Sequence, residues 1–169
     1  ELLTLDEMDR IYQNFSKTVI GLVYGDESVE KLCRIKNIPI LMVNYAGTKC
    51  SSVCTDHYGG IFDAVEYLIG HGHERIGMLF SPFEERVSWG DKARLSAYKD
   101  ALSKHNIKFT RELCAYGVRN QLDAIGKMLI TQKPTALIAC GESLTLPVKY
   151  ALELFNKRIP EDISLITFY

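Results

Sequence analysis

Residues 135–140 read Thr-Ala-Leu-Ile-Ala-Cys, and a stretch with helical spacing follows over residues 142–156. The first run is apolar almost throughout, so it predicts a strand that is buried on both faces. The apolar side chains of 142–156 recur at intervals of three and four residues, which predicts a helix with one buried face. A strand of this kind followed by an amphipathic helix is the basic unit of an α/β fold with a parallel sheet.

The same alternation extends to both ends of the chain. Apolar residues at helical spacing predict the helices, and short apolar runs between turn residues predict the strands. The predicted helices span residues 4–15, 26–35, 58–69, 91–105, 122–129 and 142–156, and the predicted strands span residues 19–24, 38–43, 51–55, 76–80, 113–116, 135–140 and 163–168. The sequence therefore predicts a doubly wound α/β architecture in which helices cover both faces of parallel sheets.

The composition limits the classes of function. The 169 residues include 20 Lys plus Arg against 21 Asp plus Glu. A free-standing nucleic-acid-binding module usually carries a basic excess, so we expect any DNA-binding part to lie outside this chain. Neither a run of about 18 apolar residues nor the start of a signal peptide occurs, and the five scattered cysteines fit reduced thiols, so we expect a cytoplasmic protein without membrane contact.

Motifs for enzyme chemistry are missing from the sequence. Phosphate-binding, dinucleotide-binding and nucleophile-elbow patterns do not occur, and neither does C-x-x-C, so we expect no enzyme and no cofactor. His71, His73 and Cys54 lie near one another in the sequence, but their spacing fits no zinc pattern, which favours hydrogen bonds in a turn over a metal site. Cys50 and Cys54 have no evident charge beside them to activate a thiolate, which disfavours a redox role.

Residues just after the predicted strands are the first candidates for a site, because ligands of doubly wound sheets bind beyond the carboxyl ends of the strands. Asp56 and Glu142 form a carboxylate pair if both face one cleft, although separate roles at two helix N-termini are favoured. Arg94 falls in the first turn of its predicted helix, where the helix dipole disfavours a cation. The planar guanidinium of Arg94 can donate paired hydrogen bonds to hydroxyls or carboxylates. Two interpretations of Arg94 therefore stay open, a contact with a ligand and a solvent-exposed side chain. Trp89 is either an apolar platform for a ligand ring or a side chain packed on its own loop.

Four motifs occur in a fixed order along the chain. They are D-x-Y-x-x-x-x-x-A-x-E-Y-L-I-x-x-G-H-x-R-I over 56–76, R-x-x-A-Y-x-x-A-L over 94–102, P-T-A-x-x-A over 134–139 and I-P-E-D-I-S-L-I-x-F over 159–168. In this order and spacing they resemble the effector-binding domain of LacI/GalR-type transcriptional regulators. The resemblance covers nearly the whole chain, from Leu5 to Tyr169.

This resemblance implies two Rossmann-like lobes with parallel sheets, as in type I periplasmic binding proteins, with the effector between them. It implies part of the N-terminal lobe in residues 1–70, part of the C-terminal lobe in residues 71–169, and a piece that is incomplete at both ends. The implied function is the effector-sensing and dimerising domain of a bacterial repressor, which responds to a small sugar-like ligand and reaches operator DNA through a headpiece absent from this chain. The alternatives are a periplasmic-type solute-binding protein for sugar transport and an enzyme on a doubly wound sheet.

The resemblance also implies an effector site. Arg94 matches an arginine that holds effector hydroxyls or carboxylates, and Asp56 matches an aspartate that opens a helix of the N-terminal lobe. The other implied contacts are Ser88, Trp89 and Gly90 in the loop before Arg94, Gly25 and Asp26 after the first strand, Tyr116 or Gly117 at an aromatic wall, Gly141 and Glu142 after residue 140, and Tyr169. Gly141 and Glu142 stand where the family usually has Asn-Asp, and Tyr169 replaces an aspartate that binds sugar hydroxyls. Because these polar contacts are lost, we expect a modified sugar, a more apolar ligand or a degenerate site.

Overall fold

The computed structural model describes residues 10, 20–22, 31, 40–44, 51–80, 88–116 and 121–168. The chain divides into two compact units, of which the first ends at Asp56 and the second begins at His57. This division lies at the start of a helix that ends at Gly70, whereas the predicted lobe boundary lies at the end of that helix. The assignment of the two units to two lobes stays a prediction. The predicted helices 4–15 and 26–35 lie outside the described residues, apart from one helical residue in each.

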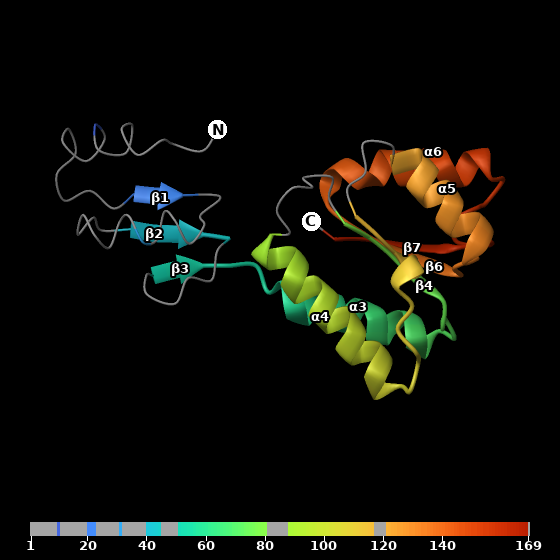
Figure 1. Cartoon of the computed structure of the whole chain (residues 1–169), viewed down its shortest axis with the longest axis horizontal. Coiled ribbons are helices and arrows are strands. Elements are labelled where there is room, and N and C mark those ends of the chain that lie inside the picture. The colour runs from blue at the N-terminus through green and yellow to red at the C-terminus, as the bar shows by residue number, and fades with distance from the viewer. Residues whose placement is uncertain are drawn as a thin grey trace. The chain divides into compact units, whose positions relative to one another are not determined.

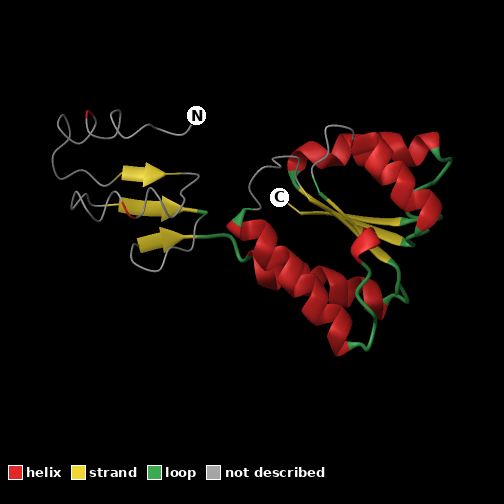
Figure 2. Cartoon of the chain, viewed as in Figure 1, coloured by secondary structure: helices red, strands yellow, loops and turns green. Residues whose placement is uncertain are grey.

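The first unit contains a parallel sheet. Its strands are β1 (Ile20–Leu22), β2 (Ile40–Val43) and β3 (Ser51–Val53), and β2 lies between the other two (Figure 2). Both pairings are parallel, with Leu41 opposite Gly21 on one side and Ser51 on the other. The predicted parallel pairing is therefore confirmed for this unit. Gly25 and Asp26, expected after β1, lie outside the described residues.

The second unit contains a four-stranded sheet in the order β5-β4-β6-β7. Its strands are β4 (Ile76–Phe80), β5 (Cys114–Ala115), β6 (Ala136–Cys140) and β7 (Ser164–Phe168). All three pairings are parallel. The two central strands, β4 and β6, are buried at every position, as their apolar sequences predict.

Helices cover both faces of this sheet (Figure 1). They are α3 (His57–Gly70) and α4 (Trp89–Lys104) on one face, and α5 (Gln121–Thr131) and α6 (Thr145–Leu154) on the other. Successive residues of a strand point to opposite faces. Met78 and Phe80 therefore pack in the apolar cluster under α3 and α4, whereas Leu79 packs in the cluster under α5 and α6.

Two short 3-10 helices complete the second unit. They are η1 (Arg111–Leu113), before β5, and η2 (Glu142–Leu144), between β6 and α6. The single helix predicted over 142–156 is therefore wrong at its start, because the first turn is a 3-10 helix and the α-helix begins at Thr145. Pro147 is the physical reason. It has no N–H to donate, so it is tolerated in the first turn of an α-helix but not farther in.

The strand order reverses between β4 and β6. The chain leaves β4 through α4 toward β5 at one edge of the sheet, and it leaves β6 through α6 toward β7 at the other edge. In doubly wound sheets, ligands bind outside the carboxyl ends of the strands at such a reversal of strand order. The fold therefore places the candidate site at Phe80 and Cys140, where these strands end.

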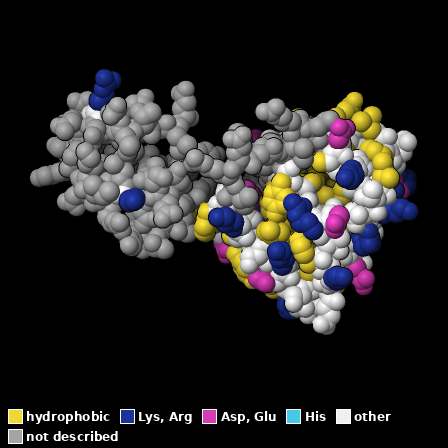
Figure 3. Space-filling model, viewed as in Figure 1, with side chains coloured by type: hydrophobic (Ala, Val, Ile, Leu, Met, Phe, Trp, Pro, Cys, Tyr) yellow, Lys and Arg dark blue, Asp and Glu magenta, His cyan; other side chains and the backbone are white. Residues whose placement is uncertain are grey.

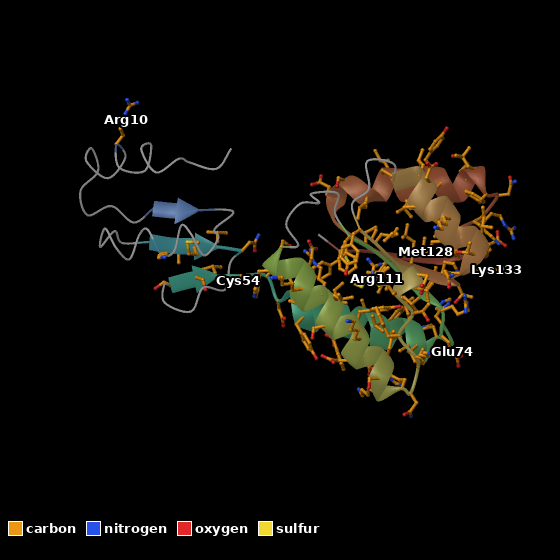
Figure 4. The ribbon with its side chains drawn as sticks, in the orientation of Figure 1. Arg10, Cys54, Glu74, Arg111, Met128 and Lys133 are labelled. Atoms are coloured by element: carbon orange, nitrogen blue, oxygen red, sulfur yellow. The ribbon has the colours of Figure 1, made fainter. Side chains whose placement is uncertain are left out.

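The surface of the described residues carries both signs of charge. Lys and Arg are interspersed with Asp and Glu over the second unit on the face that Figure 3 shows. Glu74 and Lys133 lie at the amino-terminal edge of the second sheet, away from the carboxyl ends of β4 and β6 (Figure 4). Among the described helices, none is long and apolar enough to cross a membrane.

Candidate functional site

Helix α4 begins at Trp89 because Ser88 caps it. The Ser88 hydroxyl oxygen accepts a hydrogen bond from the Asp91 N–H at 3.0 Å, and the hydroxyl donates to Asp91 Oδ2 at 2.8 Å. The predicted start at residue 91 is therefore too late, and Trp89 lies in the helix rather than in a loop. Arg94 consequently lies in the second turn, where the helix dipole gives no strong reason against a cation.

The Arg94 side chain is held by partners on two helices. Its Nη1 donates to Asp91 Oδ1 at 2.9 Å, and its Nη2 lies 3.1 Å from Nδ1 of His57 at the start of α3. The side chains of Arg94 and Asp91 are each only 12% exposed. A solvated Arg94 is therefore excluded. Arg94 Nε is also buried, and it has no hydrogen-bond partner among the described residues.

Close packing of aromatic rings and glycines fixes this arrangement. The His57 ring lies 5.5 Å from the Trp89 ring and 6.1 Å from the Phe168 ring, and the Arg94 guanidinium carbon lies 5.2 Å from the centre of the Phe168 ring. A Cβ atom on Gly90 would lie 2.8 Å from the His57 ring. Only glycine leaves room for His57 against the first turn of α4.

Arg94, Asp91, His57, Trp89 and Phe168 form what we call the Arg94 cluster, and it lies at the carboxyl edge of the second sheet. Phe80, Cys140 and Phe168 end β4, β6 and β7 and are aligned in the strand register. Burial raises the pKa of the Cys140 thiol to about 12, although the positive charge of Arg94 acts in the opposite direction. Cys140 is therefore a neutral thiol at physiological pH and has no nucleophilic role there.

A second aromatic group lies at the same edge. Tyr116 follows β5 and stacks on Phe80, with ring centres 4.4 Å apart and planes 2° from parallel. The guanidinium carbon of Arg111, which Figure 4 labels, lies 4.8 Å from the centre of the Tyr116 ring. Arg111 Nη1 also donates a hydrogen bond to the Cys114 carbonyl. Burial raises the pKa of the Tyr116 hydroxyl. The ends of β4 and β5 thus carry two stacked aromatic rings, and the role of Tyr116 in an effector site stays a prediction.

The structure brings together Ser88, Trp89, Gly90 and Arg94 from the expected effector site. Gly141 follows β6 with φ 141°, a value that favours glycine, and the exposed Glu142 begins η2. Asp56 ends the first unit and is exposed, so its pairing with Glu142 stays a prediction. Gly25, Asp26, Gly117 and Tyr169 lie outside the described residues.

Sequence reasoning missed three members of the cluster. It assigned no role to His57, Asp91 or Phe168. Asp91 had a local signal, because Ser88 and Asp91 have the spacing of a helix cap. His57 had none, because it meets Arg94 across 37 residues of chain.

The other histidines make local hydrogen bonds. His71 Nδ1 donates to the Tyr67 carbonyl at 2.8 Å, and His73 Nδ1 lies 3.0 Å from the Thr135 hydroxyl. Over the described ranges, His, Cys, Asp and Glu do not gather in threes that could hold a metal ion. The turn interpretation is therefore confirmed for His71, which bonds a backbone carbonyl.

The comparisons with known proteins identify the relatives of the chain. The sequence model of the periplasmic binding protein-like domain family matches residues 65–169. A probable HTH-type transcriptional regulator, EndR of Paenibacillus polymyxa, is 26% identical over 163 residues, which cover 95% of this chain and 43% of that protein. The HTH-type transcriptional regulator AscG of Escherichia coli is 30% identical over 148 residues, which cover 84% of this chain and 43% of that protein. The chain thus spans less than half the length of these two curated relatives.

A solved structure has the same fold over nearly the whole chain. A sugar-binding transcriptional regulator of the LacI family from Escherichia coli, in complex with phosphate, is 27% identical and has a TM-score of 0.83. The match covers 97% of this chain and 61% of that one. The chain therefore belongs to the periplasmic binding protein-like domain family, and the relatives named above are transcriptional regulators.

Proposed function

We propose that this chain is the effector-sensing and dimerising domain of a bacterial transcriptional repressor. The Arg94 cluster at the carboxyl edge of β4 and β6 carries the proposal, because it places a buried guanidinium and aromatic rings where doubly wound sheets bind ligands. The names of the relatives support a regulator over a solute-binding protein for transport. We assign the chain no catalytic reaction and no cofactor, and we place the protein in the cytoplasm.

The proposed effector is a small sugar-like molecule with an apolar face. Aromatic rings bind the C–H faces of such ligands, and Trp89, Phe168 and Tyr116 supply three rings near the carboxyl edge of the second sheet. Arg94 supplies hydrogen bonds to hydroxyl or carboxylate oxygens. The solved relative that is described as sugar-binding supports this class of ligand.

A thermal-shift panel tests this proposal. Monosaccharides, disaccharides, sugar phosphates and nucleosides are added singly to the chain, and a ligand that binds the folded state raises the melting temperature Tm. Arg94→Ala is expected to abolish the rise. Lys92→Ala is the matched control, because Lys92 is exposed on the same helix and is expected to leave the rise intact. A rise that survives in Arg94→Ala, or a panel in which nothing shifts Tm, contradicts the proposal.

The proposed link to DNA is a headpiece outside this chain. Effector binding would change the angle between two lobes and so the spacing of two headpieces on an operator, which requires different effector affinities in the two states. Reading the gene upstream of Glu1 tests this link. A basic helix-turn-helix of about 50 to 60 residues is the expected result, and a secretory signal contradicts it.

The proposed dimer surface is an apolar stripe on α6. Leu146, Tyr150 and Leu154 follow one another at four-residue spacing and are 76%, 54% and 58% exposed. Around a two-fold axis this stripe would meet its own copy on an antiparallel helix. The exposed Lys149 and Glu153 side chains flank the stripe on the same helix. The proposed surface thus offers a second copy three apolar side chains bordered by charges of both signs.

A further inference from the structure

Asp91 neutralises the charge of Arg94 inside the Arg94 cluster. Asp91 Oδ1 accepts a hydrogen bond from Arg94 Nη1 at 2.9 Å, and the two side chains are each only 12% exposed. A largely buried ion pair is screened little by salt, and separating it would leave two uncompensated charges away from water. The guanidinium therefore carries its own counter-charge before any ligand arrives.

The Asp91 carboxylate is held in this position by its own helix. It lies in the first turn of α4, where the helix dipole favours a negative charge, and its Oδ2 accepts from the Ser88 hydroxyl at 2.8 Å. Burial raises the pKa of the Tyr116 hydroxyl, and the charge of Asp91 adds to that rise. The negative charge of Asp91 thus lies beside Arg94 and acts as far as the aromatic ring that follows β5.

The ion pair offers a hydrogen-bond donor and an acceptor side by side. Each Nη atom of a guanidinium carries two N–H groups and each carboxylate oxygen has two lone pairs, so both partners can bond a ligand as well as one another. A ligand hydroxyl can accept from Arg94 and donate to Asp91 at the same time. A carboxylate or a phosphate ester can also accept from Arg94, but its negative charge then lies against that of Asp91.

We propose that Asp91 is a specificity-determining residue, which restricts the ligand at Arg94 to uncharged hydroxylated molecules and keeps sugar acids and sugar phosphates out. An unpaired arginine would bind both classes. The class of ligand rests on the proposed function, whereas the effect of the Asp91 charge on anion binding by Arg94 does not. Repulsion between the like charges is expected to weaken the binding of an anion by at least about tenfold.

Inorganic phosphate is the probe that tests the effect of Asp91. It is titrated at constant ionic strength into the nitrogen-15-labelled chain, and the NMR signal of the Arg94 Nε–H group, identified by its absence in Arg94→Ala, is followed. Asp91→Asn has nearly the same shape without the charge. Its Arg94 signal is expected to shift and to saturate, with phosphate bound at least about tenfold more tightly than by the native chain.

Two further variants separate the charge of Asp91 from its place at the start of the helix. Asp91→Glu keeps the charge but alters the bond with Ser88, and it is expected to bind phosphate as weakly as the native chain does. Asp100→Asn removes the same charge from an exposed position about 13 Å farther along α4, and it is also expected to bind weakly. If Asp91→Asn does not fold, as judged by circular dichroism, Asp91→Ser removes the same charge.

Pairs of sugars that differ in charge test the class of ligand. Galactose is compared with galacturonate, glucose with glucuronate, and ribose with ribose 5-phosphate, by the rise in Tm that each gives. In the native chain, the uncharged member of a pair that binds is expected to bind at least about tenfold more tightly than the anion. In Asp91→Asn this preference is expected to shrink or to reverse.

Two results overturn the proposal. One is a phosphate titration in which the Arg94 signal of Asp91→Asn responds no more strongly than that of the native chain. The other is a sugar acid or sugar phosphate that the native chain binds through Arg94 as tightly as the uncharged sugar. A sugar panel in which nothing binds contradicts the proposed function alone, because the phosphate titration needs no effector.

Discussion

Gly60 shows how closely a single residue can constrain the site. It lies in the first turn of α3, and a Cβ atom built on it would lie 2.4 Å from the Phe168 ring. That ring stacks under the Arg94 guanidinium and beside His57. The missing side chain of Gly60 therefore sets the position of the aromatic floor of the cluster.

Replacing Gly60 by alanine is expected to destabilise the chain. The new methyl group displaces the Phe168 ring, and overpacking of this kind costs about 1–3 kcal/mol of the free energy of unfolding. Gly70→Ala is the matched control on the same helix, because a Cβ atom there meets nothing within 4 Å. Alanine favours both helical positions by less than about 1 kcal/mol, so the difference between the variants isolates the clash. Equal unfolding free energies in urea would contradict this reading of Gly60.

The sequence predicted that Arg94 could bind polar groups, but it did not predict which side chains hold Arg94 in place. A planar cation after a buried strand is visible in the sequence, and so is the pair of Ser88 and Asp91. The contact with His57 is not visible, because it depends on the packing of α3 against α4. That packing is decided by the whole apolar cluster rather than by local spacing.

At the element scale, a surface ion pair joins the ends of α3 and α4. Glu66 on α3 accepts hydrogen bonds from Lys104 Nζ at 2.6 Å and from His105 Nε2 at 2.7 Å. The bond from Lys104, with a smaller contribution from His105, holds the pKa of the Glu66 carboxyl below its usual value. The pair therefore adds to the large apolar contact between the two helices that carry His57 and Arg94.

In the Glu66→Gln variant, the melting temperature Tm is expected to change less than in the native chain as the pH is lowered. Because the folded pKa of Glu66 is lower than the unfolded pKa, its stabilising effect is present above the unfolded pKa and is lost as the pH falls through the folded one. The variant should have a lower Tm than the native chain at pH 6, and the two Tm values should converge as the pH falls below the folded pKa of Glu66. Glu74→Gln, at an exposed position before β4, serves as the control. Parallel Tm curves for the native chain and Glu66→Gln would exclude the linkage.

The order of helices and strands over the described part of the second unit follows the sequence prediction closely. Strands β4, β6 and β7 match their predicted runs within one residue, because buried parallel strands leave a continuous apolar signal. The starts of α4 and α6 differ from prediction. Ser88 and Pro147 set these two starts through hydrogen bonding, which apolar spacing does not record.

At the scale of the whole molecule, the stripe on α6 predicts the oligomeric state. Sedimentation equilibrium is expected to show a dimer of the native chain and a monomer of Tyr150→Asp, because a buried carboxylate in the interface costs more than the contact gains. Tyr67→Asp is the control, because Tyr67 is 61% exposed on α3, on the other side of the sheet. A monomeric native chain, or a dimer that persists in Tyr150→Asp, would contradict the proposed surface.

The side chains of the two central strands alternate between two separate apolar cores. In β6, for example, Ile138 packs under α3 and α4, whereas its neighbour Leu137 packs under α5 and α6. Inserting or deleting one residue within β4 or β6 would move every following side chain of that strand into the opposite core. Single apolar substitutions in these strands are therefore expected to be tolerated better than changes of strand length, which would also displace the residues at the carboxyl ends.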